Sequence, residues 1–335
     1  MKEVIKKALN GPLGKAFDFL VSLGIYPAAL LLKLVRAIGV QRLPQSKKAL
    51  FNVGLFPIAA HYYEPIFGLT TEQHTKISNK RSLPGIDWNL DEQITLLQTM
   101  QFATSLNQLP YKKTDPLLFH LNNGSFESGD AEYWYQIIRV KKPKRIFEIG
   151  SGNSTLMARQ AIRDIKAEDP SYQCKHICIE PYEMPWLEKT GAEIMRNKVE
   201  DLEVSFFSEL KQDDILFIDS SHMIRPGGDV LFEYLEILPT LAPGVIVHIH
   251  DIFSPHDYLK EWLVDKVLFW NEQYLLEAFL CNNSEWKIIG ALNFLHHSYY
   301  DKLKEVSPYL TKDREPGSFY LQKRGAPTIQ IHDDL

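Results

Sequence analysis

Short apolar runs alternate with stretches of helical periodicity over the second half of the chain. Apolar residues recur at helical spacing in residues 154–168, 184–191, 228–241 and 259–280. Seven runs have the length and apolar content of buried strands: residues 145–150, 175–180, 192–196, 214–219, 244–250, 286–292 and 318–323. This alternation predicts an α/β fold with a doubly wound, seven-stranded, mostly parallel sheet that helices cover on both faces.

The first part of the chain lacks this alternation. Residues 41–125 are irregular and rich in turn signals, with one predicted helix at 90–106. Ser128 and Asp130 are both candidates to cap the first helix of the regular part. We therefore divide the chain into residues 1–45, a basic amphipathic segment, residues 46–127, a helical and irregular cap that would bind the acceptor, and residues 128–335, which carry the sheet.

Composition and charge narrow the class of protein. A formal net charge of −5 gives no sign of a nucleic-acid partner. Three cysteines are too few and too unevenly spaced for a disulfide framework, which indicates a reducing, cytoplasmic location. Whether the chain forms a homo-oligomer is left open by the sequence.

Basic residues gather at the start of the chain. Residues 1–50 carry nine Lys or Arg against two acids, beside an apolar run at 17–40. Pro27, Lys33 and Arg36 interrupt that run, and a span requires roughly 20 apolar residues. Two interpretations stay open: residues 1–40 contact the inner membrane face peripherally, or this helix packs on the protein's own core.

A glycine turn follows the first predicted strand. Gly150 and Gly152 lie between strand 145–150 and a helix, so backbone N–H groups face a ligand that can approach closely. A dinucleotide fingerprint requires a third glycine at position 155, where Thr155 stands. It also requires an acid about 20 residues on, but the next acid that ends a strand, Glu180, lies further away.

The segment Glu148-Ile-Gly150-Ser-Gly152 resembles the first motif of the class I S-adenosylmethionine-dependent methyltransferases, and the resemblance extends over roughly residues 128–324. It implies that Glu148 and the turn face the methionine part of the cofactor and that Glu180 holds its ribose. Ser154 stands where the family has a third glycine. The cofactor-binding residues that the resemblance implies are Glu148, Gly150, Ser151, Gly152, Ser154, Thr155, Glu180, Pro181, Glu200, Asp201 and Asp219.

Titratable residues also follow the fourth and fifth strands. Asp219 and His222 end one run, and His250 and Asp251 end the other, with His248 two positions earlier. The carboxyl ends of adjacent parallel strands meet at one edge of the sheet, where such folds bind ligands. The pattern resembles metal-dependent O-methyltransferases of small molecules and sugars.

That second resemblance implies specific roles. Asp219 would be a metal ligand and His222 the base, and His250 and Asp251 stand where the family has paired acidic ligands. The imidazole of His250 is a departure from the family, and it favours Mn²⁺, iron or zinc over Mg²⁺ or leaves the site without metal. In the metal-assisted case we expect Mg²⁺ or Mn²⁺.

The expected function is methyl transfer from S-adenosylmethionine to oxygen on a hydroxylated small molecule, a glycan or a glycolipid. One alternative is a non-heme metal oxygenase or hydrolase that uses His248, His250 and Asp251 as two imidazoles and one carboxylate. Another is a scaffold that binds the cofactor without catalysis.

Overall fold

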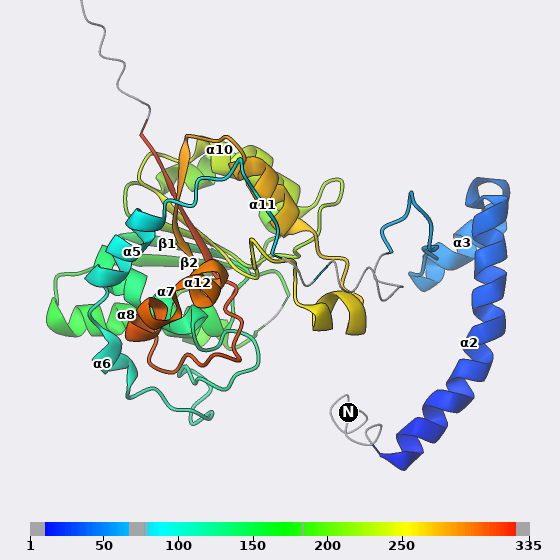
Figure 1. Cartoon of the computed structure of the whole chain (residues 1–335), viewed down its shortest axis with the longest axis horizontal. Helices are drawn as coiled ribbons and strands as arrows, with labels where there is room; N and C mark the ends of the chain where they lie inside the picture. Colours follow the sequence, from blue (N-terminus) through cyan, green and yellow to red (C-terminus); the bar gives the residue numbers. More distant parts are fainter. Residues whose placement is uncertain (1–10, 67–76, 78–79, 183, 326–335) are drawn as a thin grey trace, which may run out of the picture. The chain divides into compact units, whose positions relative to one another are not determined.

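The computed structural model describes residues 11–66, 77, 80–182 and 184–325. The chain forms two compact units, residues 1–73 and residues 74–335 (Figure 1). The first ten residues of the predicted basic segment and the last ten of the predicted sheet region lie outside the described residues, as do parts of the predicted cap.

A seven-stranded sheet forms the centre of the second unit. Its strands are β1 (Arg145–Ile149), β2 (Lys175–Ile179), β3 (Glu193–Met195), β4 (Ile215–Ile218), β5 (Ile246–Ile249), β6 (Trp286–Ala291) and β7 (Phe319–Lys323). The order is β3-β2-β1-β4-β5-β7-β6, and only β7 runs antiparallel to its neighbours. All seven predicted strands and the mostly parallel arrangement are confirmed.

Helices cover both faces of the sheet (Figure 1). One face packs against α5 (Leu90–Thr99), α6 (Ala103–Leu106), α7 (Asp130–Lys141), α8 (Asn153–Glu168) and α12 (Leu292–Val306). The other packs against α11 (Glu272–Leu280) and a continuous helical segment made of α9 (Asp229–Phe232), a π-helical turn (Glu233–Ile237) and α10 (Leu238–Thr240). Because both faces are buried, the parallel strands are mainly apolar, with Glu148, His176 and His248 as buried polar exceptions.

The first unit consists of α2 (Pro12–Ile38), a 3₁₀ turn (Val40–Arg42) and α3 (Pro44–Val53). Pro27 lies inside α2, which begins with Pro12 in its first turn, where a missing N–H costs nothing. The predicted boundaries at 45/46 and 127/128 differ from the division at 73/74. Leu97, Leu106 and Phe126, from the predicted cap region, belong to the core beneath the sheet.

Three predicted helices are shorter than the periodicity suggested. The run 90–106 breaks after α5, where the N–H of Phe102 donates to Gln136 Oε1 (3.0 Å). The run 184–191 forms only the 3₁₀ turn Leu187–Lys189. The run 259–280 splits into a π-helical turn (Glu261–Asp265) and α11, because the N–H groups that begin α11 donate to the carbonyl of His222. At each of these helix breaks, a hydrogen bond to a distant residue or within a local turn replaces a hydrogen bond of the α-helix.

Candidate functional site

A cavity of about 270 Å³ opens at the carboxyl ends of β1, β2 and β4. Five of the predicted cofactor-binding residues line it: Gly150, Glu180, Pro181, Glu200 and Asp219. Tyr182, Lys198, Ser220, Ser221 and Arg225 complete much of its wall. The cavity therefore lies where doubly wound sheets bind their ligands.

Gly150 fixes the shape of the turn at the floor of this cavity. Its φ is +76°, and a Cβ built on it would lie 1.9 Å from the carbonyl oxygen of Asp219. The N–H of Asp219 in turn donates to the carbonyl of Ile149 (2.9 Å). Only glycine allows the β1 turn and the end of β4 to approach this closely.

The Glu180 carboxylate is held at the end of β2 by backbone donors. Ser151 N–H donates to its Oε2 (3.2 Å) and Tyr182 N–H to its Oε1 (3.0 Å). These two bonds orient the carboxylate, and a carboxylate is the acceptor that two ribose hydroxyls require. The cradle at Gly150 and this oriented carboxylate fit S-adenosylmethionine.

Glu148 lies beneath the turn. Its side chain is fully buried and accepts hydrogen bonds from the hydroxyls of Ser154 and Thr155 (2.8 Å for Thr155). The His176 ring nitrogen is 3.0 Å from the same carboxylate, with Cys178 Sγ at 3.5 Å. The structure thus gives Glu148, Ser154 and Thr155 a part in bracing the turn, and none of the three lines the cavity. Direct contact of these residues with the cofactor stays a prediction, as it does for Ser151, Gly152 and Asp201.

The side chains that follow β4 and β5 meet at one point. His222 Nε2 is 3.3 Å from Asp219 Oδ1 and 3.5 Å from Asp251 Oδ2. Donor atoms of these three residues all lie within 4.8 Å of one another, a spacing that one metal ion could bridge. His222 and Asp251 have φ of +58° and +59°, so the chain turns sharply at both. The turn at Asp251 explains how it reaches this point although His250 precedes it directly.

His250 differs from its predicted place. The candidate ion-binding group that includes Asp219 and Asp251 contains His222 in place of His250. His250 Nδ1 lies 3.5 Å from both Asp219 Oδ1 and Asp251 Oδ1, without completing a hydrogen bond to any described residue. Its other nitrogen is 3.9 Å from Asp130 Oδ2. His250 therefore lies beside the two carboxylates, and a ligand role for it stays a prediction.

The sequence did not reveal the partner of His222. Glu272, at the start of α11, is fully buried and lies 2.8 Å from His222 Nδ1, and it also accepts from Tyr234 Oη (3.1 Å). The N–H groups of Asn271 and Glu272 donate to the His222 carbonyl. The available signal was an acid at the start of the helical run 272–280, which the periodicity alone could not connect to position 222.

Asp130 has a different role from the predicted one, which was to cap the first helix of the sheet region. Gly129 is the N-cap of α7, and Asp130 is its first helical residue. Its Oδ1 accepts from the N–H of Ser318 (2.7 Å), while Oδ2 points to His250. Ser128 donates to Glu132 (2.8 Å). The predicted capping role is thus wrong for Asp130, which joins the carboxylates around His250.

Burial and charge oppose each other in this group. Burial alone would lower the pKa of His222, but hydrogen bonding to Asp219 and Glu272 raises it well above its ordinary value. Burial would also lower the pKa of His250, but the charges of Asp251 and Asp219 raise it well above its ordinary value. Burial lowers the pKa of His248, whose ring packs on Tyr320 with 4.1 Å between centroids. The carboxylates around His222 and His250 therefore favour the protonated form of both rings, whereas burial favours the neutral form of His248.

A larger cavity, of about 540 Å³, opens on the other side of the same carboxylates. Asp130, His250 and Asp251 line it, together with residues of the loops 124–128 and 313–317. Asp219 lines the first cavity and Asp251 the second, so the Asp219–His222–Asp251 group lies between them. This is the arrangement that transfer from a cofactor to an acceptor requires.

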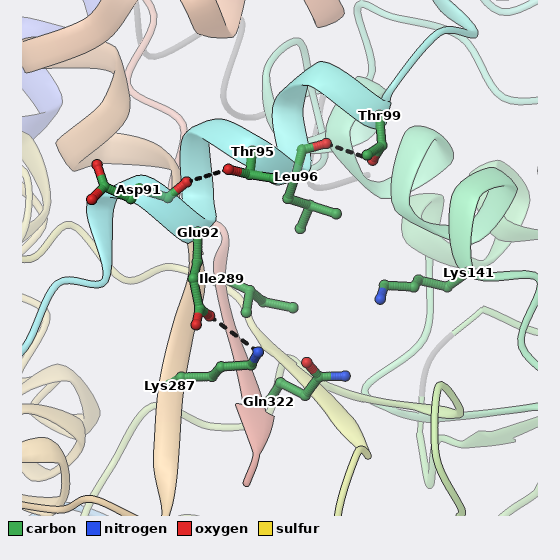
Figure 2. Close-up of a pocket in the computed structure, with 9 residues that line it drawn as sticks. All are labelled: Asp91, Glu92, Thr95, Leu96, Thr99, Lys141, Lys287, Ile289 and Gln322. Carbon is green, nitrogen blue, oxygen red and sulfur yellow. Dashed lines mark hydrogen bonds and ion pairs between the residues drawn. The ribbon is translucent and has the colours of Figure 1, made fainter.

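A further hollow lies away from this site, between α5 and the strands β6 and β7 (Figure 2). Both of its lysines are paired, Lys287 with Glu92 (3.1 Å) and Lys141 with Asp213 (3.2 Å). Gln322 faces the start of β5, opposite the carboxyl ends of the parallel strands. None of the predicted site residues lines it.

Comparison with known proteins agrees with this geometry. Residues 147–252 match the family model described as a methyltransferase domain. A relative from Archaeoglobus fulgidus, named only as an uncharacterized protein, is 30% identical over 173 residues, which is 48% of this chain and 76% of that protein.

Two solved structures are similar. The plantazolicin methyltransferase BpumL, in complex with a triazolic desmethylPZN analog and SAH, is 16% identical, with 70% of this chain and 98% of that chain covered and a TM-score of 0.34. A protein from Thermobifida fusca assigned as a methyltransferase is 12% identical, with 58% and 79% covered and a TM-score of 0.33. The matched segment runs from within β1 to just beyond Asp251, so it includes the glycine turn, β2 to β5 and both strand ends that form the site. Residues 147–252 therefore form a methyltransferase domain, built on the sheet topology expected of the class I S-adenosylmethionine-dependent methyltransferases.

Proposed function

We propose that this methyltransferase acts on a hydroxyl group of a small molecule or glycan, with a divalent cation between Asp219 and Asp251. One observation carries the proposal: Asp219, His222 and Asp251 form a metal-sized group at the meeting point of the two cavities. An alcohol is a poor nucleophile, and a cation at this point would lower its pKa and orient it. The bound cofactor supplies the methyl group.

His222 is placed to take the proton of that hydroxyl. Glu272 lies against Nδ1, which fixes the hydrogen on that nitrogen and leaves Nε2 directed at Asp219 and Asp251. A cation on the two carboxylates would offset their attraction for the His222 proton. The ring would then be available as a base at Nε2.

The donors present fit a divalent cation. Two carboxylates beside an imidazole suit Mn²⁺, Fe²⁺ or Zn²⁺ as well as Mg²⁺, and Mg²⁺ would keep several waters. The N–H of Asp219 donates to the carbonyl of Ile149, and both chain neighbours of Asp251 are held by backbone hydrogen bonds, from His250 N–H to Ile218 and from Ile252 N–H to Gly317. The chain therefore presents both carboxylates before any ion arrives.

The oxygenase or hydrolase alternative is less well supported. It needs His248 at the metal, but the His248 side chain is fully buried between Phe217 and Tyr320, with ring centroids 4.5 Å and 4.1 Å away. A measurement of methyl transfer distinguishes an enzyme from the scaffold alternative, a protein that binds the cofactor without turnover.

The test is calorimetric titration of the full-length protein with S-adenosylhomocysteine, with and without Mg²⁺ or Mn²⁺. We expect binding in the micromolar range and, with metal present, transfer of label from S-adenosylmethionine to hydroxylated acceptors. Absence of cofactor-product binding would contradict the proposal. Binding without transfer across a broad panel of hydroxylated acceptors would favour the scaffold.

We also propose that α2 places the enzyme on an anionic membrane surface. By length and composition it could cross a membrane, but residues 19–32, its run without charged side chains, extend only about 21 Å as a helix. That is shorter than a bilayer core, which favours a helix lying in the interface with Lys15, Lys33 and Arg36 near the headgroups. Its large apolar side chains are exposed among the described residues of its own unit.

Co-sedimentation with vesicles that contain phosphatidylserine tests this location. We expect the full-length protein to pellet with them and the double variant Leu23→Glu, Leu30→Glu to stay in solution. Leu235→Glu, which changes an exposed leucine of the second unit, is the matched control and should pellet like the unaltered protein. Failure of the unaltered protein to bind vesicles would contradict the proposal.

A further inference from the structure

The proposed acceptor cavity has an unusual charge. Six carboxylates line it, and the cations among its lining residues are Arg314 and the imidazole of His250. The carboxylates are Glu127, Asp130, Asp251, Glu261, Asp313 and Glu315. A cavity lined in this way repels anions and attracts cations over its whole volume.

Part of this charge is compensated within the protein. Glu127 pairs with Arg314, and Glu261 pairs with Lys266 (2.8 Å) at the exposed rim. Asp219 and Asp251 would share the proposed metal ion, and Asp130 faces His250. The remaining carboxylates, Asp313 and Glu315, lie in the loop before β7, on the same cavity wall as Arg314.

The carboxylate of Glu315 is held in one orientation through only one of its two oxygens. Asn293 Nδ2 (2.8 Å) and His297 Nε2 (2.9 Å) both contact its Oε2, and no described residue hydrogen-bonds to its Oε1. The two contacts hold the carboxylate in one orientation, and Glu315 also lines an adjoining hollow of about 210 Å³. A ligand donor can therefore meet Oε1 without breaking an existing bond.

Two other groups show that the cavity is built for a polar ligand. His250 is 5% exposed, and its Nδ1, beside the cavity, makes no hydrogen bond to a described residue. Trp262 lines the wall, packed at 5.3 Å against Phe253 and 5.0 Å against Trp270, and offers a ring face to an apolar or cationic surface. His250 Nδ1 lies 3.5 Å from both Asp219 Oδ1 and Asp251 Oδ1, at the outer limit of a hydrogen bond, and a ligand oxygen would offer it a shorter one.

We propose that the acceptor is a polyhydroxylated molecule that carries an ammonium group, of the amino-sugar or amino-alcohol class. This inference rests on the proposed function, because it places the reacting hydroxyl at Asp251. The ammonium group lies at Glu315, with Asp313 adding to the attraction, and a hydroxyl of the acceptor meets His250. A carboxylate at the same position of the acceptor is excluded by like charge.

Three probes test this class: glucose, glucosamine, in which an ammonium group replaces one hydroxyl of glucose, and glucuronate, in which a carboxylate replaces its hydroxymethyl group. Their affinities are measured by titration calorimetry on full-length protein saturated with S-adenosylhomocysteine and Mn²⁺. We expect glucosamine to bind about ten-fold more tightly than glucose, and glucuronate to bind most weakly. High salt should narrow the difference, because it screens the carboxylates.

Two Glu→Gln variants locate the effect. Glu315→Gln keeps an oxygen for Asn293 and should bring the glucosamine-to-glucose ratio close to one. Glu261→Gln removes a carboxylate that lines the same cavity but is paired with Lys266, and it should keep the ratio. Equal binding of glucosamine and glucose by the unaltered protein, or no binding of any of the three, overturns the inference, as does an unchanged ratio in Glu315→Gln.

Cofactor-product binding separates this failure from that of the proposed function. If S-adenosylhomocysteine does not bind the unaltered protein, the methyl-transfer site itself is contradicted. If it binds with equal affinity in both variants while the sugars show no discrimination, only the ammonium class is overturned. The residues changed here do not line the cofactor cavity.

Discussion

The Nδ1 atom of His222 lies 2.8 Å from a carboxylate oxygen of Glu272, and both side chains are buried. Tyr234 Oη holds the other oxygen of that carboxylate at 3.1 Å. The start of α11 therefore holds His222 twice, by its side chain and by backbone N–H donors to the His222 carbonyl. This double contact fixes which imidazole nitrogen faces Asp219 and Asp251.

Replacing Glu272 by Gln should remove the charge that favours protonated His222 and lower the pKa of the ring. We expect kcat to fall about 10- to 100-fold, the range for a residue that orients a metal-site imidazole. Titration of the His222 ring by NMR in metal-free protein measures the pKa directly. The control is Glu277→Gln, on the same helix, where the glutamate is hydrogen-bonded to Arg81 and Ser254. This variant should leave the pKa of His222 unchanged.

His222→Ala distinguishes a base from a ligand. If His222 is the base, we expect kcat to fall roughly 10²- to 10⁴-fold while Mn²⁺ affinity and S-adenosylhomocysteine affinity are retained. If His222 holds the metal, Mn²⁺ affinity falls together with activity. Asp219→Asn is the comparison, since it should abolish the metal dependence in either case. Calorimetry with Mn²⁺ alone gives the affinity for each variant, and retained activity in His222→Ala would remove it from the chemistry.

The fold was predictable because its signals are local. Each parallel strand is a short, mainly apolar run, and each is separated from the next by a helix or a turn of ordinary length. The helix breaks near Met100 and after Asp265 were not predictable, since they arise where Gln136 and His222 accept backbone bonds from residues far away in sequence. Periodicity reports burial, and it contains no information about such partners.

The site was predictable to the extent that it lies on strand ends. Gly150, Glu180 and Asp219 follow three neighbouring strands, so the topology brings them to one cavity. Glu272 and Asp130 begin helices, and only the packing of α11 and α7 directs them at His222 and His250. Glu148 lies at a position of β1 whose side chain points under the turn, a distinction that the motif alone did not make.

Glu180→Ala should weaken S-adenosylhomocysteine binding by about 1–3 kcal/mol, the magnitude of lost hydrogen bonds to a charged group. Some of the effect comes through the turn, because Glu180 also accepts from Ser151 N–H. Glu188→Ala, an exposed acid in the same strand-to-strand connection, should leave the affinity unchanged. Calorimetric titration of both variants measures the difference, and unchanged affinity in Glu180→Ala would take this carboxylate out of the cofactor site.

Glu233→Gln should change how stability depends on pH. Burial, with the charges of Glu272 and Asp229, raises the pKa of Glu233 well above its ordinary value, so the folded state retains a proton that the unfolded state releases. The contribution of protonated Glu233 is therefore fully present below the ordinary glutamate range and is lost as the pH rises toward the folded-state pKa. Within that window it lowers stability by up to about 1.4 kcal/mol per pH unit.

Glutamine cannot ionise, and it keeps an oxygen for the hydroxyl of Ser220, which donates to Glu233 at 3.0 Å. The variant should therefore become progressively more stable than the unaltered protein as the pH rises above the glutamate range. Urea denaturation at a series of pH values measures this difference. Glu236→Gln, one turn away on the exposed side of the same helical segment, should follow the unaltered protein. Parallel pH dependence in Glu233→Gln and the unaltered protein would show that Glu233 is already ionised in the folded state.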